Sequence, residues 1–203
     1  NVMLFDVPLH YHLHDASVSD GNVDLARLWE NTLTASHPDK SVTFVENHDT
    51  QPGQSLASTV APWFKAAAYA IILFNEAGVP CVFWGDLLGS PESDDLPAVR
   101  ELPVLMSIRA RAAVGPQHNA FDHPDVVGFA REGKDEIPGS GCAVILSDRM
   151  AAEKTLYVGT RHAGQEWECI LGGHPSVRVA DDGTLTGMVS DGGLSVYVPR
   201  RSA

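Results

Sequence analysis

The chain has 203 residues, of which 44% are hydrophobic, and its mean hydropathy is -0.06, which is typical of a globular protein that buries a core. Its 26 acidic and 14 basic residues give a formal charge of -12, and this excess of negative charge argues against binding to nucleic acid or to an anionic membrane. Neutral ligands such as sugars remain compatible with that charge. The three cysteines are widely spaced and form no CxxC pair, so we expect neither a disulfide framework nor a zinc site.

The sequence begins like a segment of a longer protein. It starts with Asn1 rather than Met and lacks the charged-then-apolar pattern of a secretion signal. No apolar run approaches the ~20 residues that a membrane-spanning helix needs. We therefore expect no membrane partner, and the compartment, extracellular or cytoplasmic, stays open because a targeting signal would lie outside these residues.

The first part of the sequence alternates short apolar runs with stretches of helical length. The strongest helix prediction covers residues 62–76, where Pro62 stands in a first helical turn and Gly78 follows the last one. Residues 96–113 also have a helical pattern, in which Pro103 predicts a kink or a late start. Strands are expected at 2–7, 41–46 and 80–84, and a further helix at 23–33, capped by Asp20 or Asn22.

Short strands separated by helix-length connections imply a parallel sheet covered by helices. This order of elements fits the last units of an eight-stranded βα barrel and a doubly wound sheet equally well. After residue 115 the pattern changes to short strands punctuated by Gly, Asp and Pro, which is typical of an antiparallel β-sandwich. We therefore expect an α/β part over residues 1–114 and an all-β part over 115–203. Its strands are expected at 126–131, 143–146, 155–158, 166–171, 177–180 and 194–198.

Polar residues follow the predicted strands of the first part. Asn47, His48 and Asp49 come directly after strand 41–46, Asp86 follows the next strand, and Asp6 lies near the end of the first. In parallel α/β folds the reactive groups gather at these carboxyl ends. Carboxylates there would stabilise positive charge on a sugar ring, and a histidine would hydrogen-bond its hydroxyls. The alternative is an aspartate that caps the following segment beside a locally satisfied histidine.

Long stretches of the sequence resemble one enzyme family. They are SVTFVENHDTQPGQSL and PWFKAAAYAIILFNEAGVPCVFWGD, extended on either side by LFDVPLHYHLHDAS and HNAFDHPDVVGFAREG. Together they resemble the alpha-amylases of glycoside hydrolase family 13, most closely the liquefying bacterial and fungal subgroup. The resemblance covers nearly the whole chain. It implies the last three βα units of a (β/α)8 barrel in residues 1–114, followed by the C-terminal sandwich, and retaining endo-hydrolysis of α-1,4 bonds in starch- or glycogen-like glucans.

The resemblance also implies a role for individual residues. Asp49 would be the transition-state stabiliser of the active site, His48 would donate a hydrogen bond to the same glucose ring, and Asn47 would brace the turn. Glu46 stands where many relatives have Asp. A retaining glycosidase also needs a nucleophile and an acid/base about 5 Å apart. The family's motifs for these two carboxylates do not occur in the sequence.

The isolated chain is therefore expected to be inactive without the N-terminal barrel portion as a partner. Its substrate would be an α-glucan or maltooligosaccharide. The alternative is a non-catalytic, carbohydrate-binding or vestigial fragment. A doubly wound hydrolase or nucleotide-binding protein is disfavoured, because the sequence has no glycine-rich phosphate loop and no G-x-S-x-G motif.

Calcium is the metal that the resemblance implies, at the seam between barrel and sandwich. Backbone carbonyls and carboxylates suit this ion. Val23 and Pro124 depart from the Tyr and His that relatives often have there, which is tolerable where only the carbonyls bind. The alternative is a set of ordinary loop aspartates. The implied ligands are the carbonyls of Gly21, Val23 and Pro124 and the carboxylates of Asp125 and Asp148.

Two further patterns have competing interpretations. His10, His12 and His14 alternate, so on an extended segment they would face one side and could bind zinc or copper, the alternative being solvated histidines at the rim. Trp63 and Trp84 are expected in the core rather than stacked on sugar. Trp167 fits either interpretation.

Overall fold

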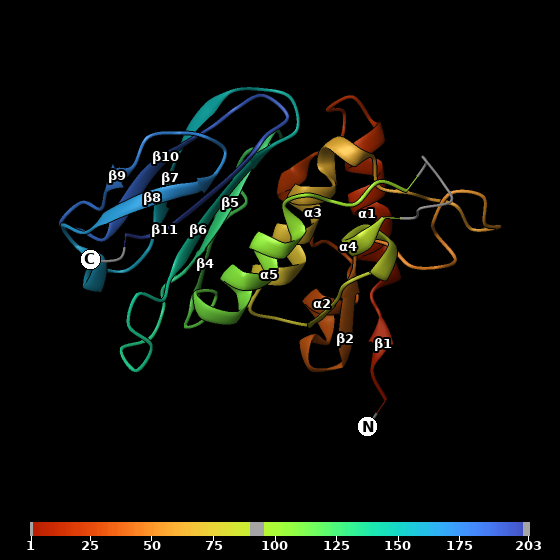
Figure 1. The fold of residues 1–203 in the computed structure, drawn as a ribbon, viewed down its shortest axis with the longest axis horizontal. Helices are drawn as coiled ribbons and strands as arrows, with labels where there is room; N and C mark the ends of the chain where they lie inside the picture. Colours follow the sequence, from red (N-terminus) through yellow and green to blue (C-terminus); the bar gives the residue numbers. More distant parts are fainter. Residues whose placement is uncertain (1, 90–95, 201–203) are drawn as a thin grey trace.

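The computed structural model describes residues 2–89 and 96–200. Figure 1 shows helices in the middle of the molecule, with a small parallel sheet on one side and antiparallel sheets on the other. One continuous apolar core joins the two sides, because it contains residues of the first helix, the central helices and three antiparallel strands. The two parts that the sequence distinguishes therefore share one buried interface.

The parallel sheet has three strands in the order β1-β2-β3. β2 (Ser41–Phe44) lies in the middle and is largely buried, whereas β1 (Leu4–Phe5) is exposed on both residues. β3 (Val79–Cys81) forms the other edge. The strand expected at 2–7 thus exists only as a short exposed edge strand.

The first helix, α1 (Val7–Val18), replaces the extended segment expected around the three histidines. Pro8 lies in its first turn, a position that proline tolerates. The side chain of Asp6 caps the helix by accepting a hydrogen bond from the backbone N–H of Leu9 at 3.2 Å. Pro8 therefore lies in the first turn of a helix, directly after the point where the sequence predicts the end of a strand.

The helix expected at 23–33 is wrong. The chain there forms only the 3-10 turn η1 (Leu25–Arg27), and Asp24 rather than Asp20 or Asn22 caps it. Asn31 has a positive φ of 58°, which interrupts any regular helix. Two short elements follow, α2 (Leu33–Ser36) and the 3-10 turn η2 (Pro38–Lys40).

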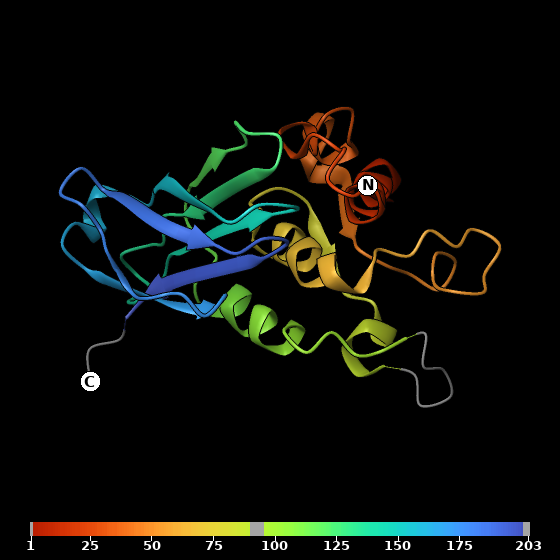
Figure 2. The same ribbon diagram turned by 90° about the horizontal axis from the view of Figure 1, so that it is seen from above.

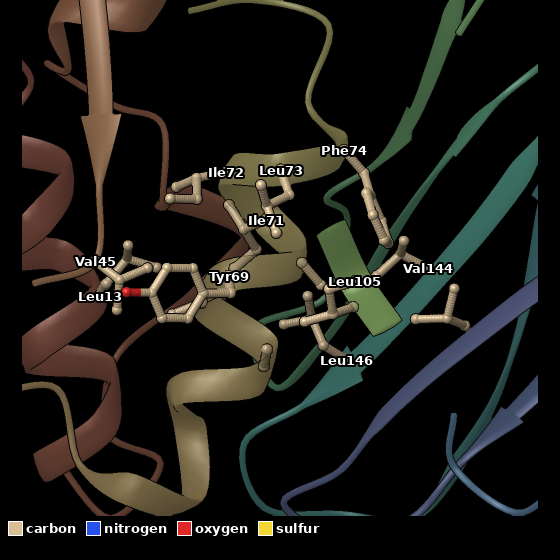
Figure 3. Close-up of a cluster of buried hydrophobic side chains, with 14 of the residues drawn as sticks. Leu13, Val45, Tyr69, Ile71, Ile72, Leu73, Phe74, Leu105, Val144 and Leu146 are labelled. Atoms are coloured by element: carbon tan, nitrogen blue, oxygen red, sulfur yellow. The ribbon is translucent and has the colours of Figure 1, made fainter. Parts of the chain in front are cut away.

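The remaining helices agree better with the sequence. α3 (Pro62–Phe74) begins at the predicted proline. α5 (Leu102–Arg111) has Pro103 in its first turn, so the late start is confirmed and the kink is not. The strand expected at 80–84 ends early, at Cys81, because α4 (Trp84–Leu88) begins three residues later. Figure 3 shows Phe74 and Leu105 packed toward Val144 and Leu146 of the antiparallel sheet.

The C-terminal part consists of a six-stranded sheet in the order β4-β5-β6-β11-β8-β9 and a two-stranded sheet of β10 and β7. Every pairing in both sheets is antiparallel. The sequence missed β4 and β10, and a 3-10 turn, η3 (Thr160–His162), precedes β8. The strands are β4 (Gln117–Ala120), β5 (Val126–Arg131), β6 (Cys142–Ser147), β7 (Ala152–Tyr157), β8 (Glu166–Leu171), β9 (Val177–Arg178), β10 (Thr184–Val189) and β11 (Leu194–Pro199).

Both faces of the neighbouring strands β5 and β6 in the six-stranded sheet are buried. On β5 and β6 the side chains alternate with the period of two that a strand imposes. Phe129 and Val144 join the core shared with the helices, whereas Val126 and Ile145 join a second core beneath the two-stranded sheet. Because both faces are covered, these strands have continuous apolar sequences rather than alternating ones.

The burial of the tryptophans differs from what the sequence predicts. Trp167 is fully buried in the second core. Trp63 and Trp84 are 44% and 70% exposed, so their expected core location is wrong. Trp63 remains fixed, because its indole N–H donates to the carbonyl of Ser17 at 2.9 Å. Among the described residues, no helix is both long and apolar enough to cross a membrane.

Candidate functional site

The segment after β2 presents the two residues that the sequence selects for sugar chemistry. Nε2 of His48 lies 3.5 Å from Oδ1 of Asp49, and their side chains are 82% and 57% exposed. Figure 2 shows the segment between β2 and α3 projecting from the helical part, on the side away from the antiparallel sheets. Both groups are therefore adjacent, open to solvent and located at the carboxyl end of the central parallel strand.

Hydrogen bonds close the turn that carries this pair. Oδ1 of Asn47 accepts from the backbone N–H of Asp49 at 2.8 Å and from that of Thr50 at 3.0 Å. The hydroxyl oxygen of Thr50 accepts in return from the N–H of Asn47 at 3.0 Å. The expected bracing role of Asn47 is confirmed by these contacts.

A buried ionic network lies beneath the turn. Nζ of Lys65 lies 3.4 Å from Oε2 of Glu46 and also pairs with Asp86, whose second oxygen accepts from the hydroxyl of Tyr69 at 2.7 Å. Burial raises the pKa of Glu46, and burial together with the charge of Asp86 raises the pKa of Tyr69. One lysine thus faces two carboxylates out of contact with solvent, an arrangement that requires its partners to stay in place.

Asp6 and Asp86 do not lie on an exposed rim, so the expected row of polar groups is wrong for both. Asp86 is fully buried in the network just described. Asp6 is also fully buried, and its carboxylate accepts from the backbone N–H groups of Leu33 and Thr34 at 3.0 and 2.7 Å. These carboxylates turn inward because buried donors satisfy them there. Only His48 and Asp49 remain exposed for a ligand.

The three alternating histidines do not form a metal site. Because they lie on helix α1, successive members point about 200° apart around its axis rather than to one side. Each imidazole Nδ1 instead faces a different backbone carbonyl, that of Val45 for His10 and that of Leu28 for His12, both at 2.8 Å. His14 likewise contacts a carbonyl at 2.9 Å. The extended geometry that the zinc or copper hypothesis requires is therefore wrong.

Four of the five residues expected to bind calcium, all except Val23, lie near one another. Asp148 and Asp125 are adjacent through a backbone hydrogen bond of 3.3 Å, and both carboxylate oxygens of Asp148 are buried without a hydrogen-bond partner. Burial and the neighbouring charge of Asp125 raise the pKa of Asp148 to about 6. An orphaned buried carboxylate beside a second carboxylate fits a bound cation.

Part of this donor set is engaged within the chain. The carbonyl of Gly21 accepts from the guanidinium of Arg149 at 2.7 Å, and the carbonyl of Pro124 accepts from the N–H of Leu25 at 2.8 Å. A carbonyl oxygen has two lone pairs, so each retains one for an ion. Val23 is half-buried and packs against the core shared with the antiparallel sheet. Over residues 2–89 and 96–200, no group of three or more His, Cys, Asp or Glu side chains could hold a metal, so any site here depends on carbonyls.

The ionic network around Lys65 was not predicted from the sequence. A signal was present, since this lysine stands inside the apolar run PWFKAAAY of helix α3. A charged residue in a stretch that is otherwise buried needs a buried partner of opposite sign. Which carboxylates supply it depends on the tertiary fold.

Comparison with solved structures defines the class of protein. The crystal structure of alpha-amylase I from Eisenia fetida matches with a TM-score of 0.67 at 17% identity, over 96% of this chain and 48% of that one. A variant of the same enzyme was solved as a complex with maltohexaose. The chain therefore has the fold of part of an alpha-amylase.

Sequence relatives identify the family. The chain is 43% identical to the alpha-amylase of Bacillus licheniformis over 98% of its own length and 40% of the relative. It is 40% identical to the cytoplasmic alpha-amylase of Escherichia coli (strain K12) over 97% of the chain and 41% of that protein. No model of a protein family matches. The resemblance to the alpha-amylases is confirmed, and the chain is homologous to the C-terminal part of these proteins, spanning about 40% of their length.

Proposed function

We propose that the chain forms one side of the catalytic cleft of an alpha-amylase-type glycoside hydrolase that cleaves α-1,4 bonds in glucans with retention. The observation that carries this proposal is the exposed pair of His48 and Asp49 at the end of β2, in a chain homologous to alpha-amylases over nearly its whole length. The glucan class is supported by the maltohexaose complex of a structural relative.

The cleft chemistry assigns complementary roles to the two residues. Asp49 holds hydroxyls of the glucosyl ring under attack and stabilises the positive charge that develops on it. His48 donates a hydrogen bond to the same ring. Neither supplies the nucleophile or the acid/base, which a retaining mechanism places about 5 Å apart. The 203 residues carry no motif for those two groups, so the chain alone is inactive.

The partner in this proposal is an N-terminal barrel portion. Residues 1–114 would be the last three βα units of a (β/α)8 barrel, and residues 115–203 the C-terminal sandwich. Parallel strands β1, β2 and β3, each followed by helix, support that division. The exposed edge strands support the presence of such a partner. Leu4, Phe5 and Val79 are 58%, 52% and 51% exposed there, whereas a closed barrel leaves no strand edge open.

Calcium belongs to the proposal as a structural ion. Asp125 and Asp148 would hold it together with the free lone pairs of the Gly21, Val23 and Pro124 carbonyls. The ion would supply positive charge to two neighbouring carboxylates and so join the loop before η1 to the sandwich. It would take no part in bond cleavage.

The test compares the chain alone with the chain joined to the N-terminal part of the Bacillus licheniformis relative. Released reducing ends and product anomers are measured on starch. We expect no hydrolysis by the chain alone, retaining hydrolysis by the joined protein, and a loss of about a thousandfold in Asp49→Asn. The exposed Asp39→Asn serves as the matched control and should keep full activity. Hydrolysis by the isolated chain, or full activity of Asp49→Asn, would refute the assignment.

A second candidate function is carbohydrate binding without catalysis. It is favoured by Trp63 and Trp84, whose exposed indole rings are surfaces on which sugars stack. Calorimetric titration of the chain with maltohexaose separates the two functions. Binding that survives Asp49→Ala but not Trp84→Ala would favour the second.

A further inference from the structure

The hydroxyl of Thr50 links the candidate catalytic turn to the buried network below it. Its proton goes to Oε1 of Glu46 at 2.5 Å, and its oxygen accepts the N–H of Asn47 at 3.0 Å. Thr50 is 6% exposed and Glu46 is 1% exposed. A single buried hydroxyl therefore connects the last residue before the turn with the first residue of the turn itself.

The other half of the turn depends on the same residues. Asn47, held through its N–H by Thr50, uses its side-chain oxygen to bind the N–H of Asp49 at 2.8 Å. The carbonyl of Thr50 accepts from the N–H of Ser58 and the hydroxyl of Thr59 at 3.0 and 3.1 Å. The backbone on both sides of His48 is thus fixed, while its side chain and that of Asp49 stay free.

Glu46 is in turn anchored by a neighbouring helix. Lys65 on α3 pairs with Glu46 and with Asp86, and Asp86 lies on α4, which begins three residues after the end of β3. The turn after β2 is therefore tied to the segment after β3 by one lysine. This fixes the distance between two neighbouring carboxyl ends of the parallel sheet.

We propose that Thr50 and Glu46, anchored by Lys65, are positioning residues that hold His48 and Asp49 in the orientation required at the sugar ring. The inference rests on the proposed function. Glu46 cannot act on substrate itself, because its side chain has no exposed surface. Its effect must pass through Thr50 and Asn47 to the peptide of Asp49. Preorganised groups of this kind matter because displacement of a catalytic group by about 1 Å can lower a rate by a hundredfold.

The fold below the turn does not need this hydroxyl. Val45, directly after β2, and Ile71 on α3 lie in the same apolar core. Phe44 at the end of β2 is buried against the rings of Phe5 and His10. Removing the hydroxyl should therefore change the turn and leave the fold intact. Lys65→Met would be a poorer test, because it would leave two buried carboxylates uncompensated and the protein would fail to fold.

The first experiment measures the turn without any catalysis. Amide hydrogen exchange is followed by NMR in the 203-residue chain for Thr50→Val, the conservative Thr50→Ser, and the control Thr186→Val. The hydroxyl of Thr186 also makes a side-chain hydrogen bond, here with the hydroxyl of Thr155, but on the exposed face of β10. We expect the amides of Asn47 and Asp49 to lose about tenfold in protection in Thr50→Val only. Unchanged protection would overturn the proposal.

The second experiment measures the consequence in the active joined protein. We expect Thr50→Val to lower kcat by about tenfold with KM changed less than about threefold, because Asp49 acts on the transition state. Thr50→Ser should restore kcat, and Thr186→Val should not change it. Lost protection with an unchanged kcat would overturn the positioning role. An inactive wild-type joined protein would instead refute the proposed function, whatever the exchange results, and the positioning role would fall with it.

Discussion

Arg131 on strand β5 donates a hydrogen bond at 3.0 Å to the carbonyl of Phe74, the last residue of helix α3. The same guanidinium donates twice to the carbonyl of Gly115, at 3.0 and 2.7 Å. Arg109 on α5 binds the carbonyl of Leu73 next to it. Two cationic side chains from different elements therefore satisfy the C-terminal carbonyls of α3, where positive charge also complements the helix dipole.

Replacing Arg131 by methionine should lower the free energy of unfolding by about 3 kcal/mol, since buried carbonyls lose charged donors. Arg200→Met is the matched control. Arg200 pairs with Glu166, but the two side chains are 59% and 49% exposed, so the expected loss is below about 0.5 kcal/mol. Urea unfolding of both variants tests this. Equal losses would mean that Arg131 contributes only as a surface residue does.

Glu46 should make stability depend on pH. Burial raises its pKa above the ordinary 4.5, so as pH rises past that value the unfolded chain releases the proton first while the folded chain keeps it. The free energy of unfolding therefore falls with rising pH up to the raised pKa and is level above it. Glu46→Gln should remove this pH dependence of the unfolding free energy, because glutamine does not titrate. Urea unfolding across that pH range, with the exposed Glu166→Gln as control, should show a flatter curve for Glu46→Gln alone.

Some of this structure is predictable because local and tertiary preferences agree. Helix α3 begins at Pro62 and runs through an apolar, alanine-rich stretch, so propensity, the proline in the first turn and burial all favour a helix there. Strand β2 is short, β-branched and buried. The pair of His48 and Asp49 follows its end after three intervening residues, and the exposed place of the pair needs no distant contact.

The parts that were wrong depend on contacts distant in sequence. Pro8 fits both the end of a strand and the first turn of a helix. Asp6 decides between them, because it caps α1 while accepting a hydrogen bond from Thr34 on α2. Likewise, whether Asp86 lies on a rim or in the interior depends on Lys65 and Tyr69. A single sequence contains the charges but does not specify which of them meet.

Calcium should stabilise the chain through Asp148, whose carboxylate has no hydrogen-bond partner. At about a hundred times the dissociation constant, a bound ion adds about 2.7 kcal/mol to the free energy of unfolding. We expect thermal melts of the chain to shift upward with calcium, less with magnesium because it requires stricter geometry, and not at all in Asp148→Asn. The exposed Asp39→Asn should respond as the wild type does. A calcium shift that persists in Asp148→Asn would place the ion elsewhere.

Gly115 joins helix α5 to the antiparallel sheet at a point where no side chain fits. Its φ is +80°, and a Cβ atom there would lie 2.1 Å from the carbonyl oxygen of Gly133. That carbonyl cannot move away easily, because the N–H of the same residue, Gly133, donates a hydrogen bond to the carbonyl of Val114 at 2.9 Å. Gly53 has a similar φ of +83° but nothing within 4 Å. Gly53→Ala should therefore cost only the conformational strain, about 1 kcal/mol, whereas Gly115→Ala should cost more than about 3 kcal/mol. Calorimetric melts of the two variants measure the difference. Similar losses of unfolding free energy would show that the backbone between α5 and the sheet moves easily to accommodate a side chain.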